Sequence, residues 1–155
     1  MTPDEEAYIH FQECLTSLNT AWAILVKLED ARIDATLWTA SFHMALIEYA
    51  KPFKQSRGVH KRSHTMPLPQ GDPGFEDLHE RLIGLRDQVL AHADLAGKDA
   101  KVYIGAVNGQ PIPLIISNTA QQLPTLTTVR RHIETLLDLL YAQIPAREHS
   151  LIKPS

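Results

Sequence analysis

The sequence predicts a mainly α-helical protein, a four-helix bundle with a β-hairpin inserted before the last helix. Four segments repeat apolar residues every three or four positions, which is the spacing of one face of an α-helix. Before the last of these segments the pattern changes to two β-rich runs around Asn108-Gly109, a dipeptide typical of tight hairpin turns. The 155 residues are enough for one domain with its own core, so we treat 1–155 as a single domain.

The first helix is predicted over about residues 3–29. Thr2 and Glu5 have the spacing of a capping box, and Pro3 suits the first helical position. The apolar face that follows is Phe11, Leu15, Leu18, Trp22 and Leu25. Cys14 lies next to this face, so we expect a buried and unreactive thiol.

The second helix is predicted from the cap Asp34 to Pro52. One apolar face consists of Trp38, Phe42, Ala45 and Tyr49, and it is widened by Leu37, Met44 and Ile47. A helix that is apolar over so much of its circumference is expected at the centre of the bundle. Core packing is the expected role of Trp22 and Trp38.

The third helix is predicted to begin with Asp72 as cap and Pro73 as first residue, and to stop at Gly97. Its apolar face is Phe75, Leu78, Leu82, Leu85 and Val89. Residues 51–74 before it show no convincing period and are predicted to form a long basic loop.

The β-hairpin is predicted over residues 101–117, where Pro111 and Pro113 indicate an edge or a bulged second strand. The last helix is predicted over about residues 124–144 and is expected to end at Pro145. His132 stands beside Arg130 and Arg131, so we expect it on the exposed side of that helix.

Composition excludes several classes of protein. Apolar residues make up 44% and charged residues 21% of the chain, and its net charge is −3, as in ordinary globular proteins. The single cysteine rules out an internal disulfide framework, and that usage fits a reducing cytoplasm. The acidic, polar N-terminus does not look like a targeting peptide, and no apolar run approaches the ~20 residues of a membrane span.

The stretch "GLRDQVLAHAD", residues 84–94, combines Arg86, Asp87 and His92 on the third helix. On a helical wheel with Phe75 at 0°, Arg86 falls near about 20° and His92 near about 260°, one on each side of the apolar face. Asp87, at about 120°, points outward. Arginine flanking an apolar face can also extend its charged end into water, and such pairs are common by chance.

"R-D-Q-V-L-A-H" resembles the R-x(4–6)-H signature of the HEPN superfamily, with Asp87 in the usual polar place. The resemblance implies a bundle of four to five helices and a metal-independent RNA endonuclease of the toxin or phage-defence type, without a cofactor. It also implies that the RNA 2′-hydroxyl attacks the adjacent phosphate. His92 would transfer protons, Arg86 would stabilise phosphate charge, and Asp87 would orient either one or be a solvated helix residue. A homodimer would bring two copies of Arg86 and His92 into one cleft, and an antitoxin could be a partner.

Residues 51–64, "KPFKQSRGVHKRSH", contain no acidic residue. An arm for the RNA backbone and an ordinary solvated loop are equally compatible with this composition. The candidate RNA contacts are Lys54, Arg57, Lys61 and Arg62. His79 is a further candidate, because it lies on nearly the same helix face as Arg86. His60 and His64 have a spacing that suits zinc on a helix, but the loop context argues against a metal site.

Two other interpretations remain open. One is a non-catalytic HEPN-like binding module that partners a nucleotidyltransferase or another protein. The other is a plain helical-bundle interaction protein in which the motif match is accidental. A monomer in solution would favour the helical-bundle interaction protein, and an intact Arg86 and His92 pair favours the enzyme over the binding module.

Overall fold

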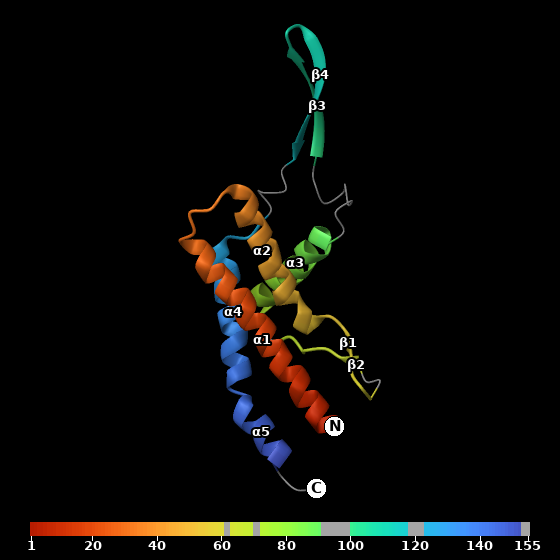
Figure 1. Cartoon of the computed structure of the whole chain (residues 1–155), viewed down its shortest axis with the longest axis vertical. Coiled ribbons are helices and arrows are strands. Elements are labelled where there is room, and N and C mark those ends of the chain that lie inside the picture. The colour runs from red at the N-terminus through yellow and green to blue at the C-terminus, as the bar shows by residue number, and fades with distance from the viewer. Residues whose placement is uncertain (61–62, 70–71, 91–99, 118–122, 153–155) are drawn as a thin grey trace.

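The computed structural model describes residues 1–60, 63–69, 72–90, 100–117 and 123–152. The chain is mainly helical with two small antiparallel hairpins, which confirms the predicted fold class (Figure 1). The long helices are α1 (Pro3–Glu29), α2 (Ala35–Ala50), α3 (Pro73–Leu90) and α4 (Leu126–Tyr141), followed by the shorter α5 (Ile144–Ile152). In these described parts, no helix has the length and apolar content needed to cross a membrane.

Helix α1 begins where its local sequence predicts. The backbone N–H of Glu5 donates to Thr2 Oγ1 at 3.2 Å, and the backbone N–H of Thr2 donates to Glu5 Oε2, so the capping box is formed. The core is made of side chains from α1, α2, α3 and α4, including Leu18, Leu46, Leu82 and Ile133, each fully buried. Cys14 is buried as expected, and burial raises the pKa of its thiol to about 11.

Helix α2 is capped by Asp34, whose carboxylate accepts hydrogen bonds from the backbone N–H groups of Thr36 and Leu37. Its predicted central position is only half right. Phe42 is buried, but Leu37 is 56% and Met44 48% exposed, so the described elements that pack against α2 leave part of its apolar surface uncovered. Trp38 is half-buried against the core, as expected.

The described parts of the basic segment 51–74 contain short elements of secondary structure that the sequence did not predict. It starts with the 3-10 helix η1 (Lys51–Phe53), and β1 (Ser56–Arg57) pairs with β2 (Ser63–His64) in a small antiparallel ladder. The sequence did not reveal these short elements, because two-residue strands carry no detectable period. Lys61 and Arg62 lie outside the described residues.

The second hairpin pairs β3 (Ala100–Val107) with β4 (Gln110–Ser117) through the predicted turn. Asn108 and Gly109 have φ angles of 51° and 77°, the left-handed pair that a two-residue hairpin turn requires. The register runs without a bulge, so the prolines of β4 mark an edge strand. Figure 1 shows this hairpin at one end of the molecule, pointing away from the helices.

The prediction of a single last helix ending at Pro145 was wrong. Helix α4 ends at Tyr141, and α5 begins at Ile144 with Pro145 in its first turn. Proline is tolerated there because its missing N–H needs no intrahelical partner. The expected exposure of His132 was also wrong, since its side chain is buried at 5% exposure on the inner face of α4.

Candidate functional site

The packing of α3 fixes where Arg86 and Asp87 stand. Asp72 caps the helix by accepting a hydrogen bond from the backbone N–H of Gly74, and Leu82 and Leu85 are buried in the core. Arg86 follows Leu85 at the border of that buried face, with 25% of its side chain exposed, and Asp87 is 50% exposed. The helical wheel therefore placed both residues correctly.

Arg86, Asp87 and Lys54 meet in one charged cluster. Arg86 Nη1 donates to Asp87 Oδ1 at 2.7 Å, and Lys54 Nζ donates to Asp87 Oδ2 at 3.0 Å. These two hydrogen bonds lower the pKa of the Asp87 carboxyl, and the bond from Arg86 has the larger effect. The cluster thus joins the basic segment to α3 and keeps Asp87 ionised.

Two cations share a single carboxylate in this cluster, so it retains positive charge. Arg86 Nε is buried and has no hydrogen-bond partner among the described residues. A guanidinium presents its donors as a fixed fork, which matches the oxygens of a phosphate. The arrangement can accept an anion at Arg86 without breaking the bond from Lys54 to Asp87.

Of the other predicted site residues, some lie in the described part of the chain and some do not. Arg57 lies exposed on β1, where it can reach solvent. His92, Lys61 and Arg62 lie outside the described residues, so their predicted roles stay predictions.

A buried polar cluster that the sequence did not reveal lies two helical turns before Arg86. The Tyr49 hydroxyl is 2.6 Å from His79 Nδ1 and 2.8 Å from His132 Nε2, and so links α2, α3 and α4. Tyr49 is fully buried. Because the hydroxyl has one proton, it donates to one imidazole nitrogen and accepts from the N–H of the other.

Aromatic rings enclose this cluster. Phe75 stacks on the His132 ring with centroids 3.9 Å apart, and Phe53 meets the His79 ring edge-on at 4.4 Å. Burial, and secondarily the neighbouring His79, lowers the pKa of His132 to about 4, and burial also lowers the pKa of His79. Both imidazoles are therefore neutral at physiological pH, and His79 can contact RNA only through its other ring nitrogen.

A sequence signal for this cluster existed in α4. His132 lies three residues after Val129 and four before Leu136, both of which are buried on the inner face. The prediction that His132 is exposed relied on the adjacent Arg130 and Arg131 instead of this spacing. The meeting of Tyr49 with two histidines from other helices depends on tertiary packing and has no local signature.

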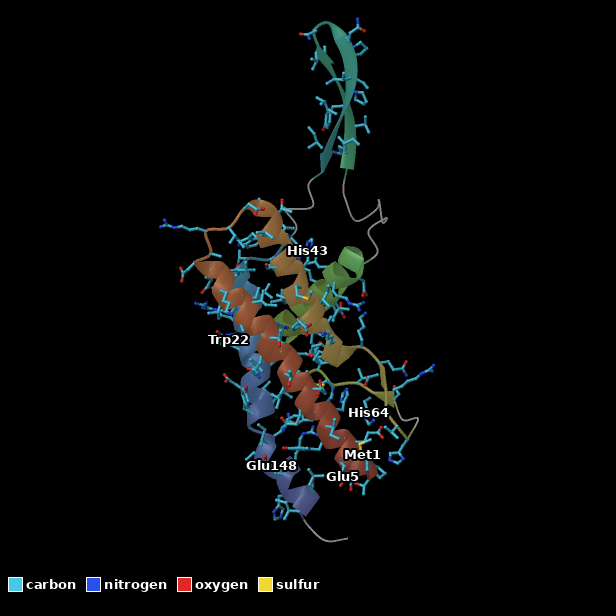
Figure 2. All side chains as sticks on the ribbon, viewed as in Figure 1. Met1, Glu5, Trp22, His43, His64 and Glu148 are labelled. Carbon is cyan, nitrogen blue, oxygen red and sulfur yellow. The ribbon has the colours of Figure 1, made fainter. Side chains whose placement is uncertain are left out.

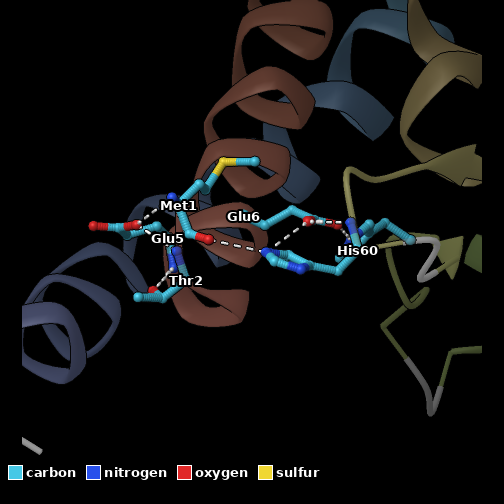
Figure 3. Close-up of polar contacts among 6 residues, drawn as sticks. Met1, Thr2, Glu5, Glu6 and His60 are labelled. Atoms are coloured by element: carbon cyan, nitrogen blue, oxygen red, sulfur yellow. Dashed lines mark hydrogen bonds and ion pairs between the residues drawn. The ribbon is translucent and has the colours of Figure 1, made fainter.

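The basic segment is anchored to the start of α1 by Glu6. This carboxylate is 5% exposed, and it accepts a hydrogen bond from the backbone N–H of His60 at 3.1 Å and lies 2.6 Å from His64 Nε2. The ring of His60 also reaches the Met1 carbonyl at 2.9 Å, as Figure 3 shows. The contact with His64, labelled beside α1 in Figure 2, lowers the pKa of Glu6.

Gly58 makes this anchoring possible, because a Cβ at that position would come within 1.5 Å of Glu6 Oε1. The histidines whose spacing raised the question of zinc thus face one carboxylate. Within the described ranges, no group of three or more His, Cys, Asp or Glu side chains is placed to hold a metal ion.

Comparisons of this chain with protein-family models, with curated proteins and with solved structures found no match.

Proposed function

We propose that this protein is a metal-independent RNA endonuclease of the HEPN type that acts as a homodimer in the cytoplasm. The observation that carries the proposal is the cluster at α3. There Asp87 holds Arg86 at the border of the core with 25% of its side chain exposed, its buried Nε has no hydrogen-bond partner among the described residues, and Lys54 adds a second cation 3.0 Å from Asp87. Two parts of the sequence that were assigned separately to catalysis and to RNA binding are thereby adjacent.

The proposed reaction is transesterification within the RNA. The 2′-hydroxyl attacks the adjacent phosphorus, the 5′-oxygen leaves, and the products carry a 2′,3′-cyclic phosphate and a 5′-hydroxyl. Arg86 stabilises the negative charge that develops on the phosphate oxygens. Asp87 holds the guanidinium in place through the 2.7 Å bond to Nη1.

The reaction requires a base that takes the 2′-hydroxyl proton and an acid that gives a proton to the 5′-oxygen. An imidazole titrates near neutral pH and suits either role. The motif supplies one histidine per chain, His92, and the two buried imidazoles are bound to Tyr49. A second copy of the chain supplies the second His92, and this requirement is the reason for proposing a dimer.

The test is cleavage of single-stranded RNA by purified His92→Ala and Arg86→Ala proteins. Loss of a general acid or base costs about 10²–10⁴-fold in rate. Loss of a charge-stabilising donor costs about 10²–10³-fold. Arg131→Ala is the matched control, since Arg131 is exposed on α4, and it should cleave at the wild-type rate.

Cleavage should persist in a chelator and leave cyclic phosphate ends, which end-group analysis detects. Wild-type rates in either Arg86→Ala or His92→Ala would remove the catalytic assignment. A protein that binds RNA without cleaving it would favour the binding-module alternative.

A further inference from the structure

The hairpin β3–β4 exposes more large apolar side chains than a surface segment needs. Between 46% and 74% of each side chain remains accessible to solvent. These residues are Val102, Tyr103, Ile104, Val107, Leu114, Ile115 and Ile116. Figure 1 shows the hairpin extending away from the helices, so the bundle leaves these side chains uncovered. An isolated two-stranded hairpin is marginally stable in water, and a larger sheet stabilises it.

The turn determines which backbone groups of the hairpin are free. In a two-residue hairpin the closing pair, Val107 and Gln110, exchanges hydrogen bonds, and the pairs then alternate along the ladder. The even-numbered residues of β3 and the odd-numbered residues of β4 therefore point their N–H and C=O groups outward. Pro111 and Pro113 fall at such outward positions, where no ladder bond is lost.

The two edges of the hairpin consequently differ. Pro111 and Pro113 deprive the β4 edge of donors next to the turn, which is how edge strands are blocked from further pairing. On β3, all outward positions, from Ala100 to Ala106, carry an N–H group. Strand β3 is thus the open edge.

We propose that β3 pairs antiparallel with β3 of a second copy of this chain, forming a four-stranded sheet in the order β4–β3–β3–β4. The register in which a two-fold axis passes through Tyr103 gives a hydrogen-bond partner to each outward backbone group of this edge. Val102 then lies opposite Ile104 of the other copy, and the outward groups from Ala100 to Ala106 all find partners. The two Tyr103 side chains face each other at close distance, a favourable cross-strand pair.

The charge distribution fits a second copy. Lys101 is the only charged residue in residues 100–117. In the register centred on Tyr103 it lies opposite Gly105 of the other copy, which avoids a pair of like charges. One lysine is too little positive charge for this hairpin to hold a nucleic-acid backbone.

The same asymmetry explains why assembly stops at two copies. A hairpin with two open edges would add chains without limit, whereas one open edge closes around a two-fold axis. This inference does not depend on the proposed RNA cleavage.

The test compares two proline variants by sedimentation equilibrium over a range of protein concentrations. Ile104→Pro removes an outward donor from the open β3 edge, and Ile115→Pro removes one from the β4 edge that is already interrupted. Both replace an exposed isoleucine on the same face of the hairpin. We expect wild type and Ile115→Pro to dimerise, and the dissociation constant of Ile104→Pro to rise about tenfold or more.

Ile104→Lys provides a second variant that keeps the N–H and adds charge to the edge, and it should also weaken the dimer. Circular dichroism checks that the helices remain. The proposal is overturned if the wild-type protein stays monomeric at protein concentrations up to about 100 times a micromolar dissociation constant. So does a dimer that neither proline variant weakens, or that both weaken equally.

Discussion

The Tyr49 hydroxyl is expected to stabilise the fold through its two hydrogen-bond contacts with histidines. It bridges Nδ1 of the half-buried His79 and Nε2 of the buried His132. Tyr49→Phe keeps the ring and leaves the imidazoles of the half-buried His79 and the buried His132 without that partner. The free energy of unfolding should fall by about 1–3 kcal/mol in urea denaturation.

Tyr141→Phe is the matched control for that change. The Tyr141 hydroxyl exchanges hydrogen bonds with Asn19 at the surface, so its loss should change stability by less than about 0.5 kcal/mol. Equal losses in the two variants would contradict a special role for the buried hydroxyl.

His132 makes stability depend on pH. Its pKa is lowered to about 4 by burial in the folded protein, whereas an unfolded histidine titrates near 6.5. The unfolded chain therefore binds this proton first, and the folded state loses stability as pH falls from about 6.5 to about 4. At about 1.4 kcal/mol per pKa unit, the loss is about 3 kcal/mol, and stability is full above pH 6.5.

Urea titrations at several pH values check this expectation, with His132→Gln as the comparison. Glutamine does not titrate, so the variant should lose less stability than wild type between pH 6.5 and 4. Parallel pH profiles for the two proteins would show that His132 is not the responsible group.

At the scale of elements, local signals predicted the helices well. Thr2, Asp34 and Asp72 each cap a helix where expected, because capping depends on side chains within a few residues of the helix start. Asn108-Gly109 likewise set the hairpin. Pro145 was predicted to end the last helix, but it lies in the first turn of α5, because proline is also tolerated where a helix begins.

The candidate site was predicted only in part, because local patterns give the orientation of a side chain on its helix but not its long-range contacts. The wheel gave the orientation of Arg86 and Asp87, since both follow from the period of α3. The contact of Lys54 with Asp87 spans 33 residues, and it depends on how the basic segment docks against the helices. That docking depends on buried Glu6, which no periodic pattern distinguishes from its exposed acidic neighbours.

The basic segment leads to a prediction about RNA binding. Glu6 anchors it, while Arg57 is exposed and Lys54 adjoins Arg86 through Asp87. Each phosphate contact to single-stranded RNA adds about 0.7 to the log–log salt slope. Neutralising Arg57, Lys61 and Arg62 to glutamine should flatten the slope by up to about 2 and weaken binding similarly for all sequences.

Neutralising Lys27, Arg32 and Arg131 instead removes the same charge from exposed positions near the end of α1, in the connection that follows it and on α4, and it should leave the slope nearly unchanged. Filter binding at a series of salt concentrations measures both slopes. An unchanged slope in the loop variant would make the segment an ordinary solvated connector.

At the scale of the whole molecule, the proposed site is complete only when two chains meet. The cleavage rate should therefore follow the concentration of dimer rather than of chains. Well below the dissociation constant, the dimer concentration rises with the square of the protein concentration, and above it the dependence becomes linear. RNA cleavage measured over a dilution series gives this curve directly.

Mixing chains tests whether both copies contribute a histidine. His92→Ala protein added in excess to wild type draws wild-type chains into dimers that hold one His92 and lack either the base or the acid. Cleavage should then fall, whereas an equal excess of Ile104→Pro, His92→Ala protein should inhibit less if the β3 edges hold the dimer together. A rate that is linear in protein at every dilution, and unaffected by the inactive chains, would show that one chain suffices for cleavage.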